Sequence, residues 1–189
     1  YPYKYIYSFI TKDEFNRPII NILVKEENGD KLLKIIELNI EEVDRLIDVE
    51  ADEAVSYNYN PVNDGLYFMY PTCIKEIRRS DMKLIRTCNI DSNYDFLDCK
   101  YIFDSGVYKY YYLDKLSNNI CIYTINKELE FVNEIKLNAL SNLDKDYLIN
   151  KSFVINHNKK NETLLMYSYR NYETLQNKTS KIICHVLRD

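Results

Sequence analysis

The residues best suited to chemistry are few and widely spaced in this chain. Its 189 residues include two histidines, His157 and His185, and five cysteines, none of which forms a Cys-x-x-Cys pair. Zinc sites are built from closely spaced cysteines and histidines, so no metal site is predicted. His185 follows Cys184, but neighbours on a strand point to opposite faces and cannot form a nucleophile–base pair. The sequence therefore predicts a protein that is not an enzyme and needs no cofactor.

Carboxylates are concentrated between residues 37 and 53. This acidic segment contains Glu37, Glu41, Glu42, Asp44, Asp48, Glu50, Asp52 and Glu53. Carboxylates can act in acid–base catalysis or bind Ca²⁺, but this segment lacks the fixed aspartates and the glycine of a calcium-binding loop. We interpret it as a solvated acidic face.

Two clusters on predicted strands are candidates for binding. Lys75, Arg78, Arg79, Lys83 and Arg86 lie on one predicted hairpin, where they either guard an exposed sheet edge or form a strip for an acidic partner. A run of tyrosines lies at residues 108–112, and tyrosine is frequent both in binding hot spots and in strands. The candidate binding residues are Tyr108, Tyr110, Tyr112, Lys75, Arg78 and Arg79.

Cys73 and Cys88 are the cysteines whose spacing suggests a disulfide. A two-residue turn at Ser80-Asp81 would place them opposite each other on paired strands, with Cα atoms about 5.5 Å apart. Free thiols in a reducing compartment are the alternative. The compartment, cytoplasmic or secreted, is left open.

Composition limits the classes of protein. Hydrophobic residues make up 46% of the chain, which argues against disorder. The net charge is −4, so a nucleic-acid-binding surface is not expected. No apolar run approaches the length of a membrane-spanning helix, so no membrane span is predicted.

Short apolar runs separated by turn residues predict antiparallel strands along the whole chain. The clearest stretch is 64–89, in which three runs are joined by Pro71-Thr72 and Ser80-Asp81. Similar stretches recur about every 50 residues and predict one all-β domain with units at 1–39, 40–89, 90–138 and 139–189. The units end at equivalent tripeptides, namely Leu38-Asn39-Ile40, Cys88-Asn89-Ile90 and Leu137-Asn138-Ala139.

The first unit is the least regular. Three strands are predicted there, and its missing strand leaves it shorter than the others. A short helix is predicted over residues 40–47, because Asn39 and Glu42 resemble a helix N-cap box before apolar residues at helical spacing.

A repeat of about 50 residues built from four short strands resembles β-propeller proteins, in which each strand meander forms one blade. The resemblance covers the whole chain at the level of pattern. Family signatures are absent: there is no Trp-Asp dipeptide, no Gly-Gly pair and no tryptophan. The resemblance implies a β-propeller or part of a larger one, with a β-sandwich as the alternative.

The function expected from this pattern is a non-catalytic module that binds a protein partner through propeller loops, as a scaffold or as a subunit of a larger complex. One alternative is a glycan-processing propeller enzyme with carboxylates such as Asp64, Asp104 or Glu162 at a central pocket. Another is a secreted β-sandwich of a parasite or virus that binds host proteins and contains disulfides.

Overall fold

A computed structural model describes residues 3–27, 33–38, 43–103, 105–114, 116–117, 119–138, 147–157, 162–171 and 180–188. Side chains are described for these residues except 43–46 and those beyond 137. Within these ranges the protein is all-β, with fifteen strands and no helix. The described part of the chain accordingly contains no helix that could cross a membrane.

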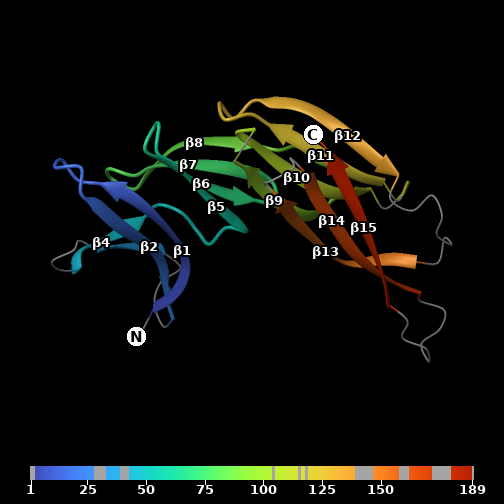
Figure 1. Cartoon of the computed structure of the whole chain (residues 1–189), viewed down its shortest axis with the longest axis horizontal. Helices are drawn as coiled ribbons and strands as arrows, with labels where there is room; N and C mark the ends of the chain where they lie inside the picture. Colours follow the sequence, from blue (N-terminus) through green and yellow to red (C-terminus); the bar gives the residue numbers. More distant parts are fainter. Residues whose placement is uncertain are drawn as a thin grey trace. The chain divides into compact units, whose positions relative to one another are not determined.

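The strands form four antiparallel sheets, and within each sheet the spatial order follows the sequence (Figure 1). Three sheets have four described strands and the fourth has three. Sheet A contains β1 (Tyr3–Lys12), β2 (Pro18–Glu26), β3 (Leu33–Leu38) and β4 (Val43–Val49). Sheet B contains β5 (Ser56–Asn60), β6 (Gly65–Tyr70), β7 (Cys73–Arg78) and β8 (Lys83–Asn89). Sheet C contains β9 (Asp95–Ile102), β10 (Val107–Asp114), β11 (Asn119–Ile125) and β12 (Phe131–Asn138), and sheet D contains β13 (Tyr147–His157), β14 (Glu162–Asn171) and β15 (Ser180–Arg188).

The all-β prediction and the predicted meanders are confirmed, but the helix predicted over residues 40–47 is wrong. Residues from Val43 onward form β4, which pairs with β3 from Leu38↔Val43 to Leu33↔Val49. Pairing with a neighbouring strand satisfies the backbone along β4, and this outweighs the weak cap signal. Sheet A therefore has four strands, and the first repeat does not lack one. A short run at residues 172–175 also predicts a strand, but these residues lie outside the described part of the chain.

Asn and Asp make several turns, as their tolerance of left-handed backbone conformations predicts. Asn16 and Asp64 have φ angles of 63° and 51°. Asp13 stabilises the β1–β2 turn because its carboxylate accepts hydrogen bonds from the backbone N–H groups of Phe15 (2.9 Å) and Arg17 (2.8 Å). Leu129 also has a positive φ, 64°, which its residue type would not predict.

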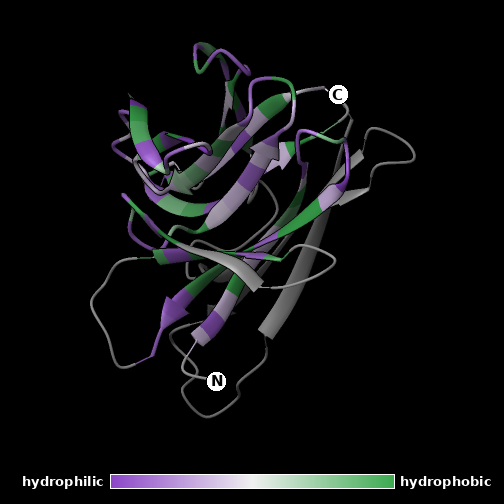
Figure 2. Cartoon of the chain, turned by 90° about the vertical axis from the view of Figure 1, so that its left-hand side faces the viewer, coloured by the Kyte–Doolittle hydropathy of each residue, from purple (hydrophilic) through white to green (hydrophobic). Residues whose placement is uncertain are grey.

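The chain divides into two compact units, Tyr1–Asn89 and Ile90–Asp189. In the first unit, sheets A and B pack face to face around a core of buried residues. This core consists of Phe9, Leu23, Leu33, Ile35, Val49, Ala51, Leu66, Phe68, Ile77 and Met82. Hydrophobic and hydrophilic residues alternate along the strands (Figure 2), as one buried face per strand requires.

Aromatic side chains join the first strands of sheets A and B. Phe9 of β1 stacks on Tyr59 of β5 with ring centroids 4.6 Å apart, and Tyr7 stacks on Tyr57 at 5.7 Å. The alternation of aromatic residues along each strand puts these rings on one face. These ring contacts connect the two sheets through their first strands.

Burial differs systematically between strands. β6 of sheet B and β10 of sheet C are buried on both faces, whereas β8 and β12, the last strands of the same sheets, are largely exposed. A strand buried on both faces belongs to a sheet that is covered on both sides. This gradient is what stacked propeller blades require.

Candidate functional site

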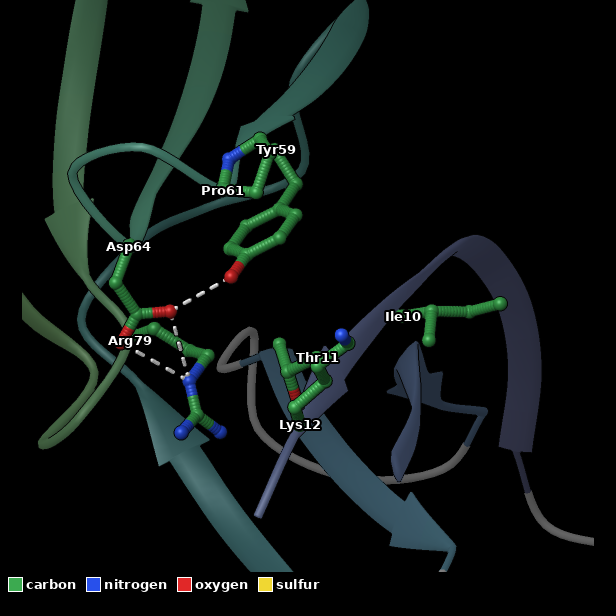
Figure 3. A pocket seen from close by; sticks show the side chains of 7 residues that line it. All are labelled: Ile10, Thr11, Lys12, Tyr59, Pro61, Asp64 and Arg79. Atoms are coloured by element: carbon green, nitrogen blue, oxygen red, sulfur yellow. Dashed lines mark hydrogen bonds and ion pairs between the residues drawn. The ribbon is translucent and has the colours of Figure 1, made fainter. Parts of the chain in front are cut away.

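A pocket of about 350 Å³ lies within the first unit, between the ends of sheets A and B. Its lining residues are Ile10, Thr11, Lys12, Tyr59, Pro61, Asp64 and Arg79 (Figure 3). The first three end β1, and the others lie at the end of β5, in the β5–β6 turn and directly after β7. In an antiparallel meander, the turn after the first strand and the turn after the third strand lie at the same end of the sheet. Residues that are distant in sequence therefore meet at this end.

Arg79 links the two sheets at the base of the pocket. Its Nε donates to both carboxylate oxygens of Asp64, at 3.0 and 3.2 Å, and its Nη1 donates to Glu37 of β3 at 3.0 Å. The backbone N–H of Arg79 also donates to the carbonyl oxygen of Asp64, at 3.3 Å. One guanidinium thus holds a carboxylate from each sheet, and this arrangement fixes the relative position of the two sheet ends.

Tyr59 completes the polar base. Its hydroxyl donates to Oδ1 of Asp64 at 2.8 Å. Burial, followed by the hydrogen bond to Asp64, raises the pKa of Tyr59 from 10.0 to about 12. The phenol therefore remains a hydrogen-bond donor at physiological pH, and Asp64 accepts from both Tyr59 and Arg79.

Thr11 and its neighbour Asn21 form the buried wall on the side of sheet A. The Nδ2 atom of Asn21 donates to Oγ1 of Thr11 at 2.9 Å, and both residues are buried. Lys12 is exposed beside them. The pocket thus combines a rigid ion-paired base with an exposed ammonium and the apolar ring of Pro61. Such a cavity can accept one side chain of a binding partner.

The predicted tyrosine surface has a different environment. Tyr108, Tyr110 and Tyr112 have exposed fractions of 1%, 0% and 1%. Their rings pack against other aromatic residues of sheet C, for example Tyr108 against Tyr101 at 4.9 Å and Tyr112 against Phe96 at 5.9 Å. This burial does not fit an outer binding surface. Strand propensity and packing within the sheet account for the tyrosine run instead.

Most of the predicted basic cluster is engaged within the chain. Arg78 pairs with Asp81 at 2.9 Å, Arg79 pairs with Asp64 and Glu37, and Arg86 pairs with Glu76 at 2.7 Å. The ammonium of Lys75 lies 4.9 Å from the ring centroid of Tyr70. Of the predicted binding residues, Arg79 alone lines the pocket.

Glu76 is a buried carboxylate that sequence reasoning did not single out. Oε1 accepts from the Tyr67 hydroxyl at 3.0 Å and from Nδ2 of Asn63 at 3.3 Å. Oε2 accepts from Nε and Nη2 of Arg86 at 3.0 and 2.7 Å. Both oxygens are therefore occupied by donors of sheet B, and the group has a structural role.

The predicted Cys73–Cys88 disulfide does not match the strand register. Cys73 is paired with Asn89, and Cys88 with Ile74, so the two thiols point to opposite faces of sheet B. The turn was predicted to contain two residues, but it contains four, since the last pair of β7 and β8 is Arg78↔Lys83. A bulge after Glu76 shifts the register further. Among the described residues, Cys73, Cys88, Cys99 and Cys121 form no disulfide.

Of the carboxylates in the alternative enzyme hypothesis, Asp64 lies in the pocket, Asp104 is outside the described residues, and the side chain of Glu162 is not described. Among the described side chains, no group of three or more His, Cys, Asp and Glu residues is arranged to hold a metal ion. The pairing of Asp64 with Arg79 was detectable in principle, because β6 and β7 pair at Gly65↔Arg78. Glu37 and Lys12 come from another sheet, and no local signal connects them to this site.

No known family description and no curated protein sequence matches the chain. Among solved structures, it is similar to a dihydro-heme d1 dehydrogenase, NirN, in complex with DHE, with 12% identity over 96% of this chain and a TM-score of 0.50. A structure from a study of two prolyl endopeptidases aligns over 96% of the chain at 9% identity with a TM-score of 0.48. The chain spans 39% of the first protein and 27% of the second. At such identity the likeness to the first protein concerns the fold alone, and that protein contains a propeller. The chain therefore has an all-β, propeller-like repeat fold.

Proposed function

We propose that the chain is a non-catalytic protein-binding module whose partner docks on the loop end of sheets A and B. We define the loop-end surface as the seven pocket residues together with Phe15 of the β1–β2 turn and Val62 of the β5–β6 turn. Phe15 and Val62 are both largely exposed, Val62 at 92%. Exposed apolar side chains beside an ion-paired pocket form the combination that supports this proposal most directly.

The charge distribution around the pocket favours a peptide-like partner. Arg79, Asp64 and Glu37 satisfy one another, so they provide a preorganised polar base. Lys12 carries positive charge at the rim. Arg17 is paired with Asp13 at 2.7 Å, and its guanidinium lies 5.3 Å from the ring centroid of Phe15. A partner segment with an apolar side chain for the pocket and acceptor groups for the rim would match this surface.

Peptide display tests the proposal without a known partner. A random-peptide library is selected against the full chain, and binding of the selected peptides is compared between the wild type, Val62→Asp and Leu116→Asp. Leu116 is 100% exposed in a turn of sheet C and is a matched control for Val62. We expect Val62→Asp to weaken binding by at least about tenfold, and Leu116→Asp to have no effect. Failure to select any peptide, or equal effects of both substitutions, would overturn the proposal.

A further inference from the structure

Two cationic groups of the pocket have donors that the described part of the chain does not use. Nε and Nη1 of Arg79 donate to Asp64 and Glu37, whereas its Nη2 donates to no described residue. The exposed ammonium of Lys12 likewise forms no hydrogen bond or ion pair with a described residue. Both groups line the pocket, so their N–H groups are available to a ligand.

The hydroxyl of Thr11 is a third donor in the pocket. Its Oγ1 accepts from Nδ2 of Asn21 at 2.9 Å, so this oxygen is the acceptor in that hydrogen bond. Oδ1 of Asn21 is buried without a hydrogen-bond partner among the described residues, and it therefore does not receive the hydroxyl proton of Thr11. Because Asn21 holds Thr11 in this way, the hydroxyl proton is left to donate to a ligand.

The charges that line the pocket favour an anionic acceptor. The lining contains two cations, Lys12 and Arg79, and one carboxylate, that of Asp64, whereas Glu37 pairs with Arg79 without lining the pocket. Both oxygens of Asp64 already accept from Arg79, and Oδ1 also accepts from Tyr59. Arg79 faces Thr11 and Lys12 across the pocket (Figure 3). A carboxylate has two oxygens with which to accept from donors on both sides.

We propose that the pocket binds the carboxyl-terminal residue of a protein partner, whose carboxylate accepts hydrogen bonds from Lys12, Thr11 and Nη2 of Arg79. This inference rests on the proposed function and specifies its ligand. The pocket of about 350 Å³ is small, so the apolar side chain and the acceptor group of the ligand come from one residue. A carboxyl-terminal apolar residue carries both on one Cα atom, and its side chain lies against Pro61 while its carboxylate meets the donors. An internal aspartate or glutamate would bring a carboxylate without the apolar group.

Two random-peptide libraries of equal length test this ligand, one displayed with free carboxyl termini and the other joined to the carrier through them. We expect the full chain to select peptides with an apolar last residue from the first library. Fluorescence anisotropy then compares one selected peptide as the free acid and as the carboxyl-terminal amide, and the amide should bind at least about tenfold more weakly. Lys12→Met should weaken binding of the acid by a similar factor and leave the amide unaffected. Lys83→Met, at an exposed lysine of β8 outside the pocket, makes the same change of charge and should have no effect.

Equal affinities for the acid and the amide, or equal effects of Lys12→Met and Lys83→Met, would overturn the assignment of a bound carboxylate. Selected peptides that depend on an internal aspartate or glutamate, and not on their terminus, would overturn the assignment of the carboxyl-terminal residue. In each of these cases peptides still bind and still lose affinity with Val62→Asp, so the proposed function stands while this inference fails. Failure of both libraries to yield a binder would overturn the proposed function and this inference together.

Discussion

The second strands of sheets A and B are both largely apolar but have different surroundings. β2 reads Pro-Ile-Ile-Asn-Ile-Leu-Val-Lys-Glu and β6 reads Gly-Leu-Tyr-Phe-Met-Tyr, and both carry apolar residues on their two faces. In β6, the four consecutive residues from Leu66 to Met69 are each 0% exposed. In β2, Leu23 on one face is fully buried whereas Ile20 on the other is exposed. Apolar residues on both faces thus allow a strand to be buried on both sides. Whether each face is in fact buried depends on the neighbouring sheets.

The difference extends to polar residues. The face of sheet B that points away from sheet A contains Glu76, Tyr67 and Arg86 in a connected hydrogen-bond network. On the face of sheet A that points away from its core, Ile10, Ile20 and Leu38 form one row and Ile22 pairs with Ile36 in the next row. A buried network of this kind specifies one packing arrangement, because each of its groups requires a particular partner.

The largest expected effect is loss of a core side chain from β6. Phe68→Ala should lower the free energy of unfolding by about 3–5 kcal/mol, because it leaves a cavity between sheets A and B. Ile20→Ala in β2, measured under monomeric conditions, should cost less than about 1 kcal/mol because much of that side chain is already in water. Urea unfolding followed by circular dichroism measures both. Equal losses would show that Ile20 is covered by another part of the chain.

Removal of the buried carboxylate tests the polar face of sheet B. Glu76→Ala should destabilise the chain by about 2–4 kcal/mol, since Tyr67 loses an acceptor and Arg86 loses its counter-ion. Asp81→Ala removes the partner of Arg78 from an exposed ion pair and should have little effect. If both substitutions cost the same, Glu76 would not be part of a tightly packed face.

The first residues of β6 and β2 provide a third comparison. A Cβ atom on Gly65 would lie 3.0 Å from Oδ1 of Asn63 and 3.1 Å from the ring of Tyr67. Gly65→Ala should therefore cost about 1–3 kcal/mol through displacement of these groups. Pro18→Ala at the exposed start of β2 should cost less than about 1 kcal/mol, mainly through greater freedom of the unfolded chain. Thermal unfolding of the two variants provides the test, and a neutral Gly65→Ala would contradict the tight packing at the start of β6.

The smallest expected effect is a pH dependence at the boundary between the two sheets. Burial, followed by hydrogen bonding to Asp64, raises the pKa of Tyr59 from 10.0 to about 12. The folded chain thus holds this proton more tightly than the unfolded chain. Its contribution to stability is complete below pH 10 and is lost as the pH rises from 10 toward 12.

Unfolding measured from pH 9 to pH 12 would detect this loss, and tyrosinate absorbance would follow the titration itself. Tyr59→Phe should reduce the alkaline loss of stability relative to the wild type. Tyr5→Phe provides the control for removal of an exposed tyrosine hydroxyl. An identical alkaline profile for wild type and Tyr59→Phe would contradict the assigned environment of Tyr59.

Much of the fold could be predicted from local patterns, and the errors have definite causes. The strands from Gly65–Tyr70 to Lys83–Asn89 were recognised because alternation and turn residues agree there. β4 was predicted as a helix because residues 40–47 satisfy two periodicities, and pairing with β3 decides between them. The Cys73–Cys88 register was wrong because a bulge and a longer turn shift the pairing, and neither has a clear sequence signal.

The candidate site was less predictable than the fold. Asp64 and Arg79 were both noted in the sequence, but they were assigned to different features. Their shared pocket depends on Glu37 and Tyr59, which belong to different sheets and meet when sheets A and B pack. The tyrosine run was expected at a binding surface, whereas its residues are buried. Residue type alone does not distinguish an aromatic core from an aromatic surface.

The sequence by itself determined that this chain forms antiparallel strands, because side-chain alternation and turn residues act over a few neighbours. The tertiary structure decided which apolar faces are buried, where Arg79 finds its partners and why Tyr108, Tyr110 and Tyr112 are interior residues. Those outcomes depend on contacts between segments distant in the chain. Contacts of this kind leave no local pattern, because any aliphatic or aromatic face satisfies the same alternation until another sheet covers it.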